Sequence, residues 1–106
     1  MYVSVTRTKG PPDQPRDLAT IAGQEMLPWL SQIEGFDGLL MLSDEATATT
    51  LTITFWRDRD VADRHEPVRR EFRERVTATV NVTIESLEEY DLSFGHLGPG
   101  LEELRR

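Results

Sequence analysis

The side chain best suited to acid–base chemistry in this 106-residue chain is the imidazole of His65. Its unperturbed pKa of about 6.5 lets it accept and return a proton near neutral pH. His65 falls between Val61 and Val68 on a stripe with helical spacing, so we expect it to face the core or a cavity. We interpret it as a candidate general base. A packed histidine bonded to the backbone or to a neighbouring acid would fit the same position.

Aromatic side chains offer candidate binding surfaces. Trp29 and Phe72 each lie on the inner stripe of an expected helix, where they are candidate apolar walls for a ligand. Core packing alone would also place them there. Tyr90, close to the end of the last expected strand, is a candidate for binding the same ligand through its hydroxyl.

The composition disfavours metal and cofactor chemistry. The chain has no cysteine, which removes disulfides, thiolate zinc sites, iron–sulfur clusters and cysteine nucleophiles. The two histidines, His65 and His96, lack a metal-ligating spacing, and no glycine-rich phosphate loop joins a strand to a helix. The sequence therefore predicts no metal and no cofactor, so any catalysis is expected to be metal-free.

Charge and hydropathy limit the partners. Nineteen acidic against twelve basic residues give a net charge of −7, which disfavours nucleic acid and anionic membrane surfaces. No apolar run approaches the ~20 residues of a membrane-spanning helix, and the first residues lack the pattern of a signal peptide. We expect a small, acidic, soluble protein of the cytoplasm.

Six segments have the periodicity of regular structure. In chain order they are residues 2–8 (strand), 16–33 (helix), 36–43 (strand), 50–56 (strand), 58–76 (helix) and 80–90 (strand). Pro28 is expected to kink the first helix, which starts at Arg16, and Pro67 to break the second. Asp58 is the expected N-cap of the second helix, and the alternation of the last strand shifts phase near Ser86.

The order βαββαβ predicts an α+β, ferredoxin-like fold with an antiparallel four-stranded sheet and both helices on one face. Residues 1–92 would form this domain and residues 93–106 a C-terminal tail. Residues 39–42 are all apolar, which is typical of a strand buried on both faces. Because a large exposed apolar patch is rare on a monomer, the open sheet face needs a cover. We therefore predict a homodimer through that face.

Residues 34–38 read Glu-Gly-Phe-Asp-Gly, residues 51–58 Leu-Thr-Ile-Thr-Phe-Trp-Arg-Asp and residues 89–92 Glu-Tyr-Asp-Leu. With the element order over residues 2–92, these stretches resemble the dimeric α/β-barrel superfamily. Within it, they are most similar to the antibiotic-biosynthesis-monooxygenase-like (ABM) domains. The resemblance implies a dimer whose two sheets face each other as a barrel, and a small cavity between sheet and helices in each subunit.

The family includes cofactor-free monooxygenases of aromatic polyketides, haem-degrading enzymes and domains without known activity. The resemblance implies that Trp56 lies beside the cavity, where its indole N–H could hold an oxygen-bearing substrate. A base such as His65 would deprotonate a phenol or enol, whose anion can pass an electron to dioxygen in an apolar pocket. A tryptophan that only anchors the helix to the sheet would fit as well.

Haem degradation is not expected. That branch needs an Asn on the first strand, and the only Asn of this chain is Asn81. It also needs a second Trp nine residues after the strand-three Trp and a His ten residues later, where this chain has His65 and Arg75.

Two functions therefore stay open. The chain is either a metal-free monooxygenase-like oxidoreductase acting on a flat hydrophobic molecule, or a non-catalytic dimeric module that binds a ligand or supports assembly. A pocket of roughly 300 Å³ or more beside His65 would favour the enzyme. Complete filling of the space between sheet and helices by Trp29, Trp56 and Phe72 would exclude it.

Overall fold

A computed structural model describes residues 1–14 and 17–105. The elements, in chain order, are β1 (Tyr2–Lys9), α1 (Leu18–Leu30), β2 (Phe36–Asp44), β3 (Thr49–Trp56), α2 (Arg59–Arg64), α3 (Glu66–Thr79), β4 (Thr83–Asp91), α4 (Pro99–Glu102) and the 3₁₀ turn η1 (Glu103–Arg105). The helix start predicted at Arg16 lies outside the described residues, and α1 is described from Leu18.

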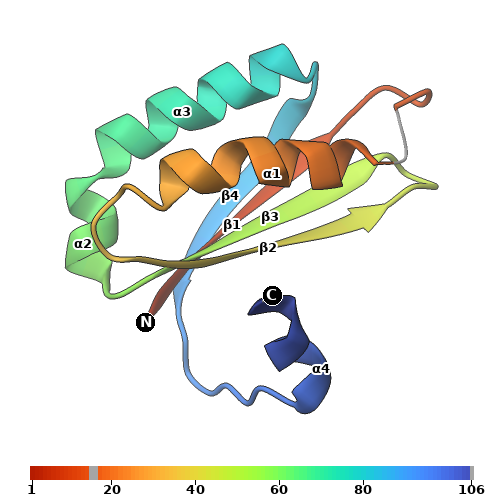
Figure 1. Cartoon of the computed structure of the whole chain (residues 1–106). Helices are drawn as coiled ribbons and strands as arrows, with labels where there is room; N and C mark the ends of the chain where they lie inside the picture. The colour runs from red at the N-terminus through yellow and green to blue at the C-terminus, as the bar shows by residue number, and fades with distance from the viewer. Residues whose placement is uncertain (15–16, 106) are drawn as a thin grey trace.

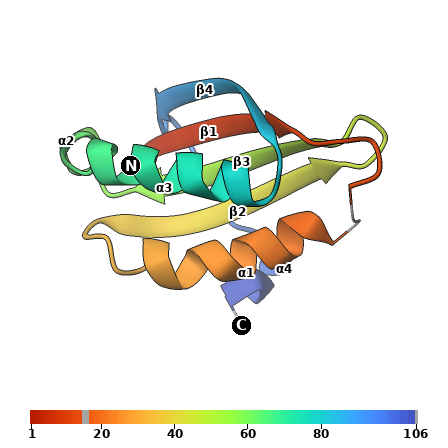
Figure 2. The same cartoon turned by 90° about the horizontal axis from the view of Figure 1, so that it is seen from above.

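The four strands form one antiparallel sheet in the order β2-β3-β1-β4. Helices α1 and α3 lie on the same side of this sheet, while α4 lies below it (Figure 1). The view from above shows α3 crossing the sheet and α1 running beside β2 (Figure 2). The ferredoxin-like α+β fold is therefore confirmed. No helix among the described residues is long and apolar enough to cross a membrane.

Local sequence signals account for the helix boundaries. Asp58 caps α2, because its Oδ1 accepts a hydrogen bond from the Val61 N–H at 2.8 Å. The predicted break near Pro67 is confirmed: α2 ends at Arg64, and Pro67 occupies the first turn of α3, where its missing N–H is tolerated. Pro28 is accommodated near the end of α1, inside the helix.

The chain turns sharply into β2 at Gly35. This residue has φ +83°, and a Cβ there would meet the Val61 Cγ1 at 2.2 Å. Its carbonyl accepts the Arg57 N–H at 2.8 Å, which ties the start of β2 to the end of β3. A second irregularity, between Arg7 and Thr8 in the β1–β4 register, confirms the phase shift expected near Ser86.

The two faces of the sheet differ in an unexpected way. The residues of β1 and β3 under the helices are mostly hydroxylated, whereas Val3, Val5, Leu51, Ile53 and Phe55 alternate with them and point to the open face. The apolar core is correspondingly small. Its buried members are Tyr2, Ala22, Met26, Leu30, Trp56, Val61 and Ala62.

Candidate functional site

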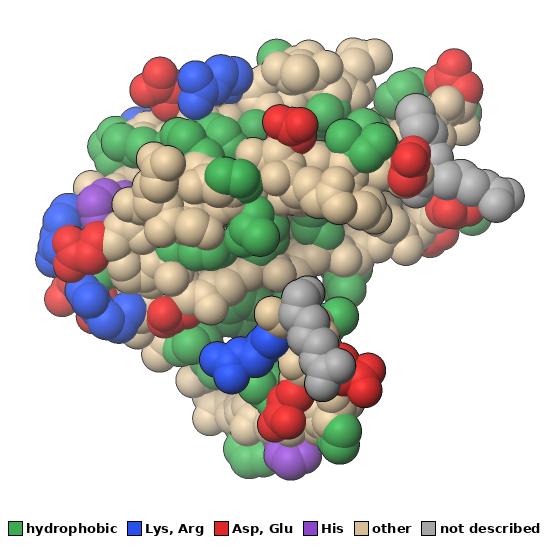
Figure 3. Space-filling view, viewed as in Figure 1, with side chains coloured by type: hydrophobic (Ala, Val, Ile, Leu, Met, Phe, Trp, Pro, Cys, Tyr) green, Lys and Arg blue, Asp and Glu red, His purple; other side chains and the backbone are tan. Residues whose placement is uncertain are grey.

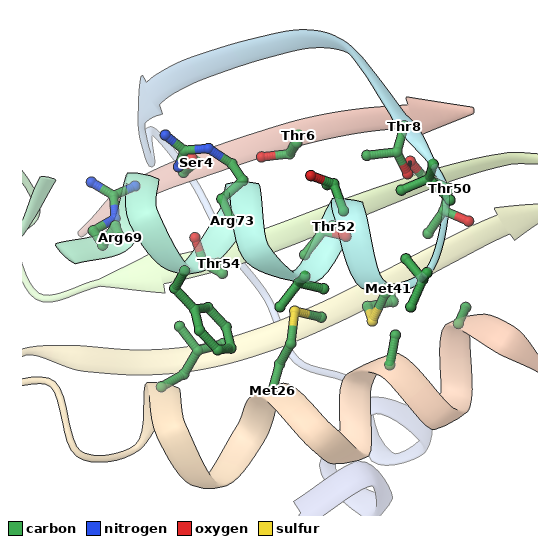
Figure 4. A pocket seen from close by; sticks show the side chains of 18 of the residues that line it. Ser4, Thr6, Thr8, Met26, Met41, Thr50, Thr52, Thr54, Arg69 and Arg73 are labelled. Atoms are coloured by element: carbon green, nitrogen blue, oxygen red, sulfur yellow. Dashed lines mark hydrogen bonds between the residues drawn. The ribbon is translucent and has the colours of Figure 1, made fainter. Parts of the chain in front are cut away.

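A cavity of about 100 Å³ lies between the sheet and helices α1 and α3. Its floor is built from hydroxyl side chains of β1 and β3, and its walls come from the two helices (Figure 4). The floor residues are Ser4, Thr6, Thr8, Thr50, Thr52 and Thr54. We call these six residues the hydroxyl floor.

Strand register places the hydroxyl floor in three cross-strand pairs: Ser4 with Thr54, Thr6 with Thr52, and Thr8 with Thr50. The Cβ atoms of directly opposed residues are about 4.5–5.5 Å apart. Successive pairs are separated by two residues along the strand, or roughly 6.5–7 Å. The floor therefore offers a regular array of groups that can each donate and accept a hydrogen bond.

Apolar and aromatic side chains face this floor. Met26 of α1 and Met41 of the neighbouring strand β2 also line the cavity, and their flexible thioethers can adapt to a ligand. Trp29 of α1 stacks on Phe72 of α3 with ring centroids 3.8 Å apart and planes 7° from parallel. This stack joins the two helices across the cavity, so both rings are walls as well as structural contacts.

Trp56 closes one end of the cavity. It is 1% exposed, and its Nε1 donates to the Thr54 Oγ1 at 2.9 Å. The Arg69 guanidinium lies over the indole, 4.7 Å from the ring centroid, and Phe36 meets the ring edge-on at 5.6 Å. Trp56 therefore orients Thr54 and supports Arg69 at the same time.

The only charged side chains among the described lining residues are Arg69 and Arg73. Arg69 is 4% exposed, and its Nη1 donates to the Ala62 carbonyl at 2.9 Å. It also pairs with Glu66 at 3.2 Å and Glu89 at 3.5 Å, which compensates the buried charge.

Arg73 has a less complete set of partners. Its Nη2 pairs with Glu66 at 3.2 Å, and no other hydrogen bond of its guanidinium is found among the described residues. The remaining N–H groups can therefore reach a ligand. Glu89, which pairs with Arg69, also interacts with Tyr2: burial and a hydrogen bond to Glu89 raise the pKa of the Tyr2 hydroxyl, so that this phenol stays protonated at neutral pH.

Three of the predicted site residues, Trp29, Trp56 and Phe72, do meet in this cavity. They do not fill it. The volume of about 100 Å³ is nevertheless below the roughly 300 Å³ expected of an enzyme pocket. Tyr90 lies elsewhere: it is 52% exposed, pairs with Val3 across the open face, and hydrogen-bonds Glu88, which raises its pKa.

His65 is not among the residues that line the cavity. The expected apolar stripe is interrupted at His65, which joins α2 to α3. Because α3 is a separate helix, its side chains do not continue the spacing of α2. Val61 is 1% exposed, but Val68 is 47% exposed and Arg69 is buried in its place. The Nε2 atom of His65 is buried without a hydrogen-bond partner among the described residues, one helical turn before Arg69.

Sequence reasoning missed the hydroxyl floor and the two arginines. The signal for the floor was the Thr alternation of β3, matched by Ser4, Thr6 and Thr8 in β1. The sequence gives no signal that singles out Arg69 and Arg73, because α3 contains four arginines. Within the described residues, no group of three or more His, Asp or Glu could hold a metal ion.

No protein-family model and no curated protein sequence matches this chain. Its fold, however, is that of several solved structures. In its fold the chain is similar to ABM-like domains. A monooxygenase from the gene ActVA-Orf6 of Streptomyces coelicolor, solved with the ligand Nanaomycin D, is 14% identical with a TM-score of 0.64, covering 92% of this chain and 91% of that one.

Two further solved structures agree on the fold. SnoaB, a cofactor-independent oxygenase from Streptomyces nogalater, is 13% identical with a TM-score of 0.63, covering 89% of this chain and 94% of that one. NE2512, a protein of unknown function from Nitrosomonas europaea, is 17% identical with a TM-score of 0.65, covering 93% and 95%. At such identities the likeness concerns the fold, and the site must carry the argument for function.

Proposed function

We propose that this ABM-like domain binds a flat, oxygen-bearing aromatic molecule in its cavity and oxidises it as a cofactor-independent monooxygenase. The observation that carries the proposal is the hydroxyl floor facing a wall of aromatic and thioether side chains. A planar molecule can place its ring faces against that wall while its oxygens meet the floor. The ActVA-Orf6 and SnoaB structures, which share the fold, lend support as oxygenases.

The polar groups of the cavity favour an acceptor-rich ligand. Ser and Thr hydroxyls and the N–H groups of Arg73 can donate hydrogen bonds, and the described lining contains no carboxylate that would hold an amine. Carbonyl and phenolic oxygens fit this pattern. Because the cavity holds about 100 Å³, a ligand of two or three fused rings requires side chains such as Met26 to move aside.

The reaction would convert a ring methylene to a carbonyl: R₂CH₂ + O₂ → R₂C=O + H₂O, with dioxygen as the oxidant. The substrate must first ionise, since its anion supplies the electrons. The positive charge of Arg73 would lower the pKa of a bound phenol or enol and so favour this anion. His65, the base suggested by the sequence, lies outside the lining and would have to act from the α2–α3 junction.

A non-catalytic ligand-binding role is the second candidate. It is favoured by the lack of His, Asp and Glu among the described lining residues, which leaves no base within the cavity. In that case the same ligands would bind without consumption of oxygen.

Binding and turnover can be measured separately with a panel of hydroxyquinones and anthrones. Both tryptophans line the cavity, so binding should quench their fluorescence, while an oxygen electrode follows turnover. We expect quenching and oxygen uptake with an anthrone, both reduced in Arg73→Gln. Quenching without uptake would select the binding role, and the absence of both would refute the proposal. Equal uptake in wild type and His65→Ala would remove His65 from the mechanism.

We further propose that the protein is a homodimer through the open sheet face. Val5, Leu51, Ile53 and Phe55 are half-buried there although no helix covers them, and Leu42 is 52% exposed. A monomer rarely leaves so continuous an apolar surface to water. Sedimentation of the intact chain tests this, and a monomer at all concentrations would contradict it.

A further inference from the structure

The C-terminal segment carries apolar side chains that its own subunit leaves exposed. Phe94 is 87% exposed, Leu97 65% and Leu104 64%, while Leu92 and Leu101 are 44% and 48% exposed. We call these five residues the apolar arm. Leu101 and Leu104 lie in the short helical stretch formed by α4 and η1, whereas Phe94 and Leu97 lie in the preceding segment, which has no regular secondary structure.

The arm starts from a fixed point. The N–H of Leu92 donates to the Met1 carbonyl at 2.9 Å, which holds the arm against the start of β1. Farther along, the Leu101 N–H donates to the Gly98 carbonyl at 3.1 Å and opens the four-residue helix α4. A helix this short is unstable in water without tertiary packing. The arm therefore has helical structure but lacks the packing that would stabilise it within one subunit.

The side of the sheet on which the arm lies indicates what it could contact. It descends from β4 to the side of the sheet opposite α3 (Figure 1) and forms a separate lobe beneath the body of the protein (Figure 3). This is the side of the open face, where a second copy would dock.

We propose that the apolar arm of each subunit packs against the second subunit of the dimer and clasps it. This inference rests on the proposed dimer. In a two-fold dimer the contact occurs twice, because the arm of each subunit packs against the other subunit. The apolar arm and the apolar open face lie on the same side of the sheet, so a second copy docked on that face supplies the apolar surface that the arm lacks.

The dissociation constant of the dimer tests the arm directly. We expect the double variant Phe94→Ser, Leu101→Ser to raise it at least ten-fold in sedimentation equilibrium. The matched control is Ile21→Ser, Val68→Ser, which removes two apolar side chains that are each 47% exposed on the helices. The control should leave the constant unchanged. An arm variant that dimerises like wild type would refute the arm contact and leave the dimer standing.

A fluorescent label identifies what the arm packs against. The chain has no cysteine, so Leu101→Cys accepts an environment-sensitive dye at one position. We expect a blue shift that grows with protein concentration and has its midpoint at the dissociation constant, with no shift for a dye at Ile21→Cys. A blue shift already complete in the monomer would mean that the arm packs on its own subunit. A shift only with phosphatidylcholine vesicles would mean a lipid surface. Either result overturns the proposal, and a chain that never dimerises refutes dimer and arm together.

Discussion

The two faces of the sheet have the same strands but opposite chemistry. The face under α1 and α3 presents the hydroxyl floor, whereas the face without helices presents Val5, Leu51, Ile53 and Phe55. A single-subunit domain of this size would normally bury the apolar face under its helices. Here the polar face is enclosed, which makes a site, and the apolar face is left for another surface.

Hydroxyls enclosed under helices provide little hydrophobic stabilisation. Thr8 donates a hydrogen bond to the Thr50 carbonyl and Thr54 accepts one from Trp56, and the proposed ligand would supply partners for the other hydroxyls. The apolar face, by contrast, would be covered in the proposed dimer. Two of the predictions below each change one face and leave the other intact, and two concern the elements that support the sheet.

The largest effect is expected on the open face. Ile53→Asp places a charge at the centre of the proposed interface, and an unpaired buried charge is strongly unfavourable. We expect the dimer to be replaced by monomer in sedimentation at micromolar concentration. Thr47→Asp, in the exposed turn between β2 and β3, is the control and should remain dimeric. A dimeric Ile53→Asp would place the interface elsewhere.

The second largest effect is expected on the free energy of unfolding, when the Trp56 indole is removed. Trp56→Ala removes the most buried large side chain and should destabilise the protein by about 3–5 kcal/mol, measured by urea unfolding. Trp56→Phe retains most of the packing but loses the hydrogen bond to Thr54, so its loss should be smaller. Equal losses for both variants would make that hydrogen bond, rather than the packing, the dominant contribution.

A smaller effect is expected on the hydroxyl floor. Thr52→Val keeps the shape of the side chain and removes one hydroxyl from the cavity. Ligand affinity should fall about 3–10-fold, the value of one hydrogen bond, in fluorescence titration with a hydroxyquinone. Stability and dimerisation should be unchanged. Thr47→Val is the control, and equal affinities in both variants would argue against contact between ligand and floor.

The smallest effect is expected on acid unfolding, from the Asp58 cap of α2, which belongs to neither face of the sheet. The hydrogen bond from the Val61 N–H lowers the pKa of Asp58 below 3.8, so the carboxylate stabilises the folded state above that pH. This contribution is lost as the pH falls through the folded-state pKa. Asp58→Asn keeps a cap without a titrating group, so its acid unfolding should be shallower than that of wild type. Identical acid profiles would exclude a role for this group.

Periodicity in the sequence was enough to predict the order of strands and helices, the Asp58 cap and the irregularity at Ser86. It also placed Trp29 and Phe72 on facing helices. These features depend on local spacing, which the sequence states directly.

Two features could not be predicted from spacing. Alternation says which residues share a strand face but not which face the helices cover, so the hydroxyl floor was not anticipated. The position of His65 failed for another reason: the helix break turned Val68 outward and Arg69 inward, and a continuous helical period no longer applied.

The hydroxyl floor has a consequence for the stability of this protein at low concentration. Because the enclosed face contributes little apolar burial, contacts between the subunits of the proposed dimer would supply a substantial part of the free energy of folding. Folding and association are then linked, and the melting temperature should rise with protein concentration. A freshly synthesised chain would remain vulnerable to proteolysis until it meets a second one, so the number of chains in the cell would itself determine their lifetime.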